Sequence, residues 1–230
     1  MIQDIDNGLL TPHRLTYFQD MVRNEQHCFI KYEVDTSSEA EDYDREEDQE
    51  ARFIESHLEN CKIQSTDSDE MFSNLYFNKS YLNNIYINQL ECYYTNIRFC
   101  LIKTLSLSYT LISSLRFDGI ITRDENSAAN HEEVPLYSAD CIILDENTRL
   151  EYLKLETFRI KHLIINTSNR SLRLILQLKD YGITKNARID KITIHSNIDI
   201  YVIDHTGTFK DTKICKVGDG HRCKINIRTG

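Results

Sequence analysis

A five-residue repeat of apolar side chains over residues 72–118 limits this chain to few folds. Nine positions spaced five apart are all apolar: Phe77, Leu82, Ile87, Cys92, Ile97, Ile102, Leu107, Ile112 and Phe117. The column two residues earlier is apolar or small throughout: Leu75, Ser80, Ile85, Leu90, Thr95, Cys100, Leu105, Thr110 and Leu115. A fixed spacing of five drifts off one face of a helix, and in a straight strand it alternates between the two faces.

A chain that turns a corner every five residues keeps both columns on its inner side. Four faces of five residues close a coil of 20 residues, and successive coils stack at about 4.8 Å, the spacing of paired strands. Residues 72–118 contain no Gly or Pro, so no strand N–H and no packed side chain is missing from the repeat. The sequence therefore predicts a mainly β solenoid.

The repeat resembles that of the pentapeptide-repeat family, whose members fold as right-handed quadrilateral β-helices. The family motif has a small residue two positions before the central Leu or Phe. Ser80, Thr95, Cys100 and Thr110 match that residue, while Leu or Ile holds the other five positions of the column. The resemblance implies a right-handed β-helix that carries binding surfaces. Some family members mimic DNA and protect topoisomerases, and others are parts of effectors that pathogens deliver.

The repeat continues in a shifted phase after a polar excursion at 122–135. Its columns are then Leu153, Phe158 and Leu163, and Leu150, Leu155, Ile160 and Ile165, followed by alternating runs that include Leu174/Leu176/Leu178, Ile192/Ile194 and Ile198/Ile200/Val202. The predicted solenoid spans residues 71–205. A hairpin over 206–230, with turns at Gly207 and Gly218–Gly220, is expected to close its end.

Residues 1–70 differ from the remainder in charge. They carry 19 Asp/Glu and 6 Lys/Arg, against 17 and 21 over residues 71–230. Thr11-Pro12 predicts the start of a helix over 12–26. Ser38 begins a capping-box pattern before a second helical stretch over 39–61. We therefore expect residues 1–70 to be an acidic segment that forms an N-terminal α-helical cap.

Composition also bears on the compartment. No apolar run approaches the roughly 20 residues that span a bilayer, so no membrane partner is expected. The seven cysteines are irregularly spaced and do not form a disulfide framework of the secreted kind. These features favour a reducing, cytoplasmic compartment, and the family resemblance adds delivery into a host cell as an alternative.

Motifs for catalysis or metal binding are weak. Cys215, His221 and Cys223 lack the paired knuckles of zinc sites. The adjacent His27 and Cys28 would face different directions on a helix. No phosphate-binding, kinase or hydrolase motif is present. We predict a protein that is not an enzyme and that has no cofactor and no metal.

Two features favour a protein partner. Tyr76, Tyr81 and Tyr86 lie five apart in an outward column and are predicted to form a stacked aromatic row, which contacts a partner or packs under the N-terminal helices. The acidic segment 39–50 can dock a basic partner through Glu41, Asp42, Asp44, Glu46 and Glu47. The leading prediction is a non-catalytic solenoid that scaffolds or modulates a protein through one coil face and this segment.

A nucleic-acid-linked role is the alternative prediction. The basic C-terminus can contact phosphates through Lys213, Lys216, Arg222, Lys224 and Arg228. The same cations can neutralise the acidic segment of their own or another copy, which would give a homo-oligomer. Residues 72–117 carry four Lys/Arg and one acid. That balance disfavours a topoisomerase-protecting DNA mimic, because a mimic needs negative charge on the rod itself.

Overall fold

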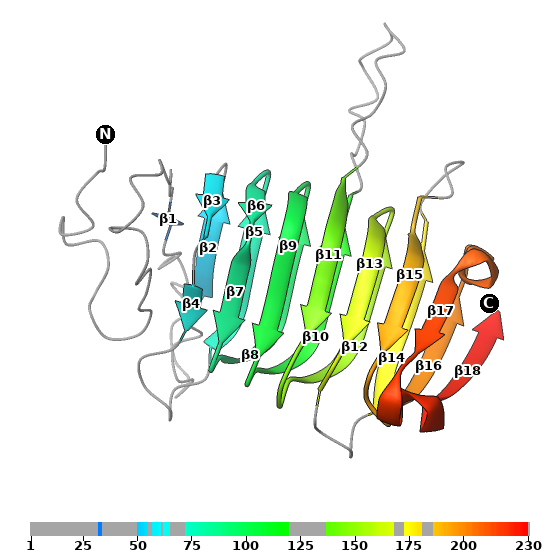
Figure 1. Ribbon diagram of the computed structural model, residues 1–230. Helices are drawn as coiled ribbons and strands as arrows, with labels where there is room; N and C mark the ends of the chain where they lie inside the picture. The colour runs from blue at the N-terminus through cyan, green and yellow to red at the C-terminus, as the bar shows by residue number, and fades with distance from the viewer. Residues whose placement is uncertain are drawn as a thin grey trace, which may run out of the picture.

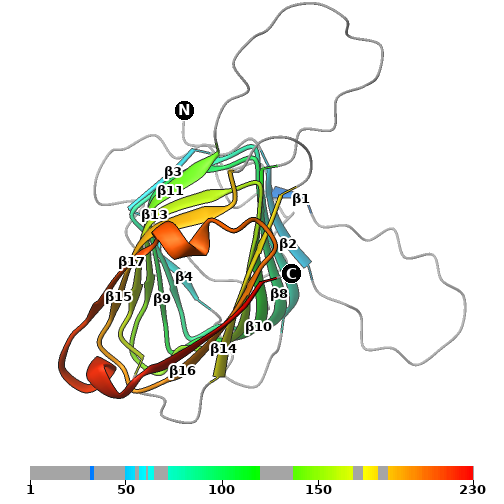
Figure 2. The same ribbon diagram turned by 90° about the vertical axis from the view of Figure 1, so that its right-hand side faces the viewer.

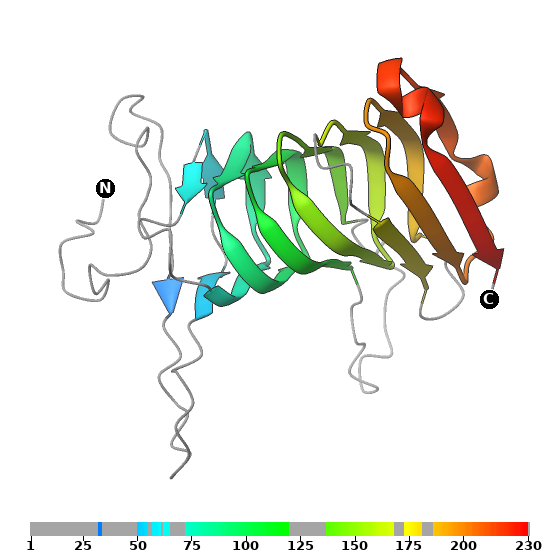
Figure 3. The same cartoon turned by 90° about the horizontal axis from the view of Figure 1, so that it is seen from below.

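The chain winds into a parallel β-solenoid of about six turns. The computed structural model describes residues 32–33, 50–54, 57–60, 62–64, 72–119, 137–167, 173–180 and 186–229. Figure 1 shows the strands side by side along one axis, and Figure 3 shows the same stack from below. The predicted mainly β solenoid is confirmed.

The strands form two nine-stranded sheets, and each coil contributes strands to both. The first sheet contains, in spatial order, β1 (Tyr32–Glu33), β2 (Glu50–Ile54), β5 (Phe72–Asn78), β8 (Glu91–Arg98), β10 (Leu111–Asp118), β12 (Arg149–Glu156), β14 (Arg173–Lys179), β16 (Asp199–Asp204) and β18 (Lys224–Thr229). The second contains β3 (His57–Glu59) and β4 (Lys62–Gln64), then β6 (Tyr81–Asn83) and β7 (Ile85–Asn88), then β9 (Leu101–Ser108), β11 (Ser138–Leu144), β13 (Arg159–Ile165), β15 (Arg188–Ile194) and β17 (Lys213–Lys216). All pairs are parallel except β1 with β2.

The strand register confirms the predicted coil length over the regular part of the repeat. Ile97 pairs with Phe77 on one side and with Phe117 on the other, so each coil there comprises 20 residues, the length of four five-residue units. In the second sheet, Leu107 pairs with Ile87 at the same separation. The next coil is longer, since Phe117 pairs with Leu155. The excursion at 122–135 that accounts for this lengthening lies outside the described residues.

Both apolar columns line the core. All nine residues of each column over 75–117 are buried, and so are the residues of the shifted columns: Leu150, Leu153, Leu155, Phe158, Ile160, Leu163 and Ile165. Two thiols belong to this core. Burial raises the pKa of Cys92 to about 11 and that of Cys100 to about 12. Both thiols are therefore neutral and act as small apolar side chains.

The turns between the two sheets use non-glycine residues in the left-handed conformation. Lys79, Gln89, Phe99 and Tyr109 have φ of 50°, 52°, 53° and 52°. This conformation is unfavourable for residues with a Cβ, but each turn is held by a hydrogen bond to the next coil. The Lys79 N–H donates to the Arg98 carbonyl and the Phe99 N–H to the Asp118 carbonyl, both at 2.9 Å. Stacking of the coils thus supports turns that a single coil would not.

The predicted helix over 39–61 is wrong where the structure describes it. Residues 50–64 contain the strands β2, β3 and β4. Phe53, Leu58 and Ile63 are buried, and they pair with the Phe77, Leu82 and Ile87 positions of the next coil. The rings of Phe53 and Phe77 stack with centroids 5.0 Å apart. The solenoid therefore begins before the boundary expected at residue 70, and the expected helix over 12–26 lies outside the described residues.

The predicted C-terminal hairpin is also wrong. β17 and β18 do not pair with each other, because β17 joins β15 in the second sheet and β18 joins β16 in the first. Two short 3₁₀ helices, η1 (Phe209–Asp211) and η2 (Gly218–Arg222), form part of the connections. A hairpin does not form because both strands add to the existing sheets. Ile214 pairs with Ile192 and Ile225 pairs with Ile200, so the inward columns continue to the end of the described chain.

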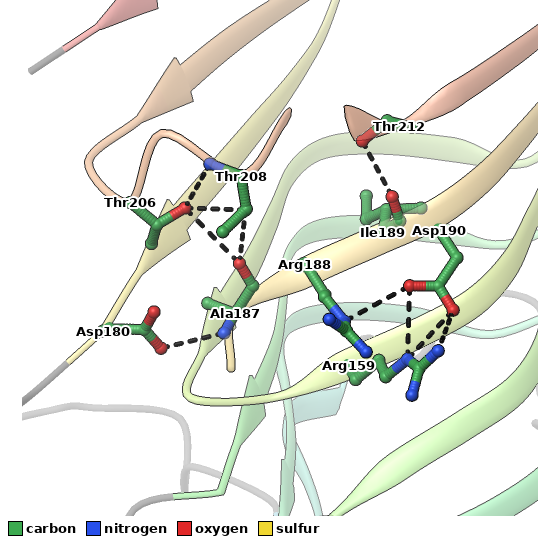
Figure 4. A network of polar contacts seen from close by, with 9 residues as sticks. All are labelled: Arg159, Asp180, Ala187, Arg188, Ile189, Asp190, Thr206, Thr208 and Thr212. Atoms are coloured by element: carbon green, nitrogen blue, oxygen red, sulfur yellow. Dashed lines mark hydrogen bonds and ion pairs between the residues drawn. The ribbon is translucent and has the colours of Figure 1, made fainter. Parts of the chain in front are cut away.

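A polar cluster joins the last coils. Figure 4 shows Thr206 and Thr208 at the carbonyl of Ala187, whose N–H donates to Asp180 at 2.8 Å. Asp204, which is 3% exposed, accepts four hydrogen bonds: from the Thr206 N–H and hydroxyl and the Gly207 N–H at Oδ1, and from the Phe209 N–H at Oδ2. Burial tends to raise the pKa of Asp204, but the hydrogen bonds from Thr206, Phe209 and Gly207 outweigh it and lower that pKa.

We expect the substitution Asp204→Asn to destabilise the protein by about 1–3 kcal/mol near neutral pH. The amide would retain one acceptor oxygen but would present its NH₂ group to the Phe209 N–H, donor against donor. Because the folded pKa lies below the unfolded value of about 3.9, the carboxylate stabilises the fold above that pH and loses this effect as the pH falls through the folded pKa. Urea unfolding of both proteins between pH 3 and pH 7 should show the difference shrinking in acid. A difference independent of pH would contradict this role of the charge.

Candidate interaction surfaces

The three tyrosines predicted to stack do not stack. Tyr76 lies on β5, Tyr81 on β6 and Tyr86 on β7, at successive positions around one coil. Stacked neighbours are one coil apart, so Tyr76 pairs with Asn96, not with another of the three. The Tyr81 ring lies instead 4.8 Å from the ring of His57. The predicted aromatic row is therefore wrong, and the five acidic candidates over 41–47 lie outside the described residues.

The register creates a different row of tyrosines on the outer face of the first sheet. Tyr94 pairs with Ser114, and Ser114 pairs with Tyr152 on its other side. The row continues through Ile175 to Tyr201 on the next two strands. We call these five residues the tyrosine strip. It crosses β8, β10, β12, β14 and β16, which is a length of about 19 Å at the usual strand spacing.

The tyrosine strip combines exposed aromatic surface with charge. Tyr94 is 54% and Tyr152 is 37% exposed, while the short Ser114 between them is buried. The Lys154 ammonium lies 5.4 Å from the ring centre of Tyr152, and the Arg173 guanidinium lies 4.9 Å from that of Tyr201. Tyrosine and arginine are enriched at protein interfaces, and cations placed over aromatic rings are attracted to them.

An ion-pair network lies beside the strip on the same sheet. Asp118 is 3.2 Å from Arg98 and 3.6 Å from Arg116, and Arg116 also pairs with Glu156 at 2.5 Å. Arg116 and Lys154 are register neighbours on β10 and β12. The strip therefore has a charged border whose members already neutralise one another, which leaves the tyrosines as its main exposed contact groups.

The second sheet brings together a cysteine and a histidine that sequence spacing did not connect. Cys141 on β11 is the register neighbour of His162 on β13. Burial, and then Asp140, raises the pKa of the Cys141 thiol, whereas burial and then Lys191 lower the pKa of His162. A nucleophilic thiolate requires the opposite shift. His162 Nε2 is 2.8 Å from the Thr193 hydroxyl, so the arrangement favours a neutral, structural pair.

The basic C-terminal residues lie on the last coil. Lys213 and Lys216 are on β17, Arg222 is in η2, and Lys224 and Arg228 are on β18. Among the described residues, none of the five has an ion-pair partner, although Lys216 donates to the Cys223 carbonyl at 2.6 Å. Six cations of the central coils differ, since each of them pairs with a carboxylate: Arg98, Lys103, Arg116, Arg159, Lys161 and Arg188. Figure 4 shows Asp190 between Arg159 and Arg188.

Metal-ligating side chains do not cluster over the part of the chain that the structure describes. There, no three His, Cys, Asp or Glu side chains gather as a metal site would require. Of the candidate ligands near the C-terminus, Cys215 is on β17, His221 is in η2, and Cys223 is buried with its Sγ 3.7 Å from the Lys224 carbonyl. The same described residues contain no helix with the length and apolarity needed to cross a membrane.

No protein-family model, curated protein or solved structure matches this chain. Its function is therefore inferred from the surfaces above.

Proposed function

We propose that this chain is a non-catalytic, protein-binding β-solenoid and that the tyrosine strip is its contact surface. The observation that carries the proposal is the exposure of Tyr94 and Tyr152 on a paired parallel sheet. Strand pairing fixes the backbone of these residues before a partner arrives, so little backbone entropy remains to be lost on binding. Tyrosine also offers a hydroxyl for hydrogen bonds beside its apolar ring.

We also propose that the chain is a degenerate relative of the pentapeptide-repeat proteins. Burial of both five-residue columns supports it, and so does the register that stacks Phe77, Ile97 and Phe117. Solenoids of this kind present long, regular faces that bind other macromolecules. The role of such a protein is to scaffold or modulate its partner by occupying part of the partner's surface.

The double substitution Tyr94→Ala/Tyr152→Ala tests the proposal. Both side chains are exposed, so stability should change by only about 0.5 kcal/mol per site, whereas a tyrosine that is a binding hot spot contributes about 2 kcal/mol or more. Affinity capture from extracts of the source cells, with quantitative mass spectrometry, should recover a defined protein with the unmodified chain. The double variant should lose that protein by more than about tenfold.

Tyr109→Ala is the matched control. Tyr109 is 48% exposed, lies in the turn after β9, and bonds Glu146 through its hydroxyl at 2.8 Å. The control should retain the partner, and circular dichroism should confirm that all three proteins are folded. Equal recovery by the double variant and the control would overturn the assignment of the strip.

A further inference from the structure

We infer that the last coil binds the acidic segment 39–50 of a second copy, so that copies associate head to tail. This surface lies at the C-terminal end of the solenoid and shares no residue with the tyrosine strip. The inference can therefore be tested independently of the proposed function.

The last coil presents open strand edges and apolar side chains. β17 ends the second sheet and β18 ends the first, and no other described strand pairs with their outer edges. Figure 2 shows this end of the coil facing the viewer. Ile214 and Ile227 are 38% and 56% exposed. Their register neighbours one coil earlier, Ile192 and Val202, are buried. Unpaired edges with exposed apolar residues are suited to adding another segment.

The charge of the last coil indicates which kind of segment it would bind. Lys213, Lys224 and Arg228 extend from the two edge strands, and Lys210 and Arg222 lie in the 3₁₀ helices beside them. None of these five has an ion-pair partner among the described residues, whereas six cations of the central coils do. Lys213 also lies opposite Lys191 in the sheet, a like-charge pair that an external anion would relieve. An acidic partner segment is the complement of this end.

The chain itself contains such a segment. Residues 39–50 hold eight acidic side chains and one basic side chain, Arg45, a net charge of −7. Tyr43 and Ala40 are its apolar members, and they can meet the exposed isoleucines. The segment leads into β2, which lies far from β18 in the first sheet.

Covalent geometry excludes binding within one copy. Glu50 belongs to β2, which is seven strand steps from β18 in the first sheet, or about 34 Å. Asp42 is eight residues from Glu50 and nine from Glu33, so its backbone can reach at most about 29 Å from Glu50, and residues nearer to either tether reach less far. Glu33 in β1, paired to β2, tethers the other side. The contact must form between copies, and because it joins unlike surfaces it can repeat from copy to copy.

The test is sedimentation velocity of the full chain over a range of concentrations and salt. At about 0.1 M salt, where the Debye length is about 10 Å, the sedimentation coefficient should rise with concentration. At about 1 M salt, where that length is about 3 Å, self-association should weaken by at least about tenfold. A monomer at every concentration in low salt would overturn the inference.

Charge exchange makes the test specific. Lys213→Glu/Lys224→Glu/Arg228→Glu reverses the basic end, and Glu46→Lys/Glu47→Lys/Asp48→Lys reverses the centre of the acidic segment. Each variant alone should remain monomeric in low salt. An equimolar mixture should form a heterodimer, because the unchanged acidic segment of one variant then meets the unchanged basic end of the other. Arg149→Glu, at an exposed cation of β12, is the matched control and should associate like the unmodified chain.

A fluorescent peptide with the sequence of residues 37–52 tests whether the last coil binds the acidic segment or a nucleic acid. Binding of this peptide to the unmodified chain, and its loss with the reversed basic end, would support the inference. Failure of the peptide to bind while a short DNA duplex binds in low salt would overturn it and assign the end to phosphates. Association that persists in every charge variant would overturn it as well.

Discussion

Replacing Phe117 with alanine is expected to lower the free energy of unfolding by about 3–5 kcal/mol. Phe117 is fully buried in β10, at the centre of the stack. Its ring lies 4.9 Å from that of Phe158, and its backbone pairs with Ile97 and Leu155 on the neighbouring coils. Truncation removes contacts to both sides at once, and the stacked strands cannot collapse into the space because their hydrogen bonds hold them at a fixed spacing.

Urea unfolding followed by circular dichroism measures this loss. In a stack where each coil contacts only its neighbours, a cavity in the middle also weakens the coupling between the two halves. The unfolding transition should therefore broaden and its denaturant dependence should fall. Leu111→Ala is the control on the same strand: Leu111 is 37% exposed, and its loss should cost under about 1 kcal/mol. Equal losses in the two variants would show that β10 is not packed as described.

Gly220→Ala is expected to destabilise the last coil by about 3 kcal/mol. A Cβ at Gly220 would lie 1.9 Å from the Ile194 carbonyl oxygen and 2.6 Å from its carbon. The same oxygen accepts a hydrogen bond from the Val217 N–H at 2.8 Å. This bond attaches the β17–η2 connection to β15, and η2 would lose it by moving away from the added Cβ. The obstacle is backbone and cannot rotate aside as a side chain would.

Gly218→Ala separates this clash from the ordinary preference of a turn for glycine. Gly218 has φ of +56°, and no atom lies within 4 Å of its added Cβ, so its substitution should cost about 1 kcal/mol through conformation alone. Hydrogen exchange by mass spectrometry should show faster exchange of β17 and β18 in Gly220→Ala, with β8 and β10 unchanged. Faster exchange throughout the solenoid would contradict a local effect at its end.

The inner side of the coil was predictable because burial there follows local corner geometry. A residue in either five-residue column faces inward whichever coil it stacks on, so Ile97 and Thr95 could be assigned before any pairing was known. The same rule holds for Phe53, Leu58 and Ile63, which are also five apart. The sequence predicts a helix there because Ile54, Leu58 and Cys61 fit helical spacing within a Glu-rich stretch. Strands form instead because stacking on the next coil outweighs that weak local preference.

The outer side depended on tertiary structure. Tyr94 and Tyr152 are distant in the sequence, and only the coil register, lengthened by an excursion between β10 and β11, places both beside Ser114. The five-residue period predicts a stacked row of Tyr76, Tyr81 and Tyr86 instead. Residues five apart, however, follow one another around a single coil, and only residues one coil apart stack on each other.

The sequence by itself thus determined the solenoid, its 20-residue coil and its core, because an inward position needs only the local turn. Tertiary structure decided which outer residues become neighbours, where the stack begins and ends, and which cations find carboxylates. Those features depend on pairing between coils, whose separation in the sequence changes with every inserted loop.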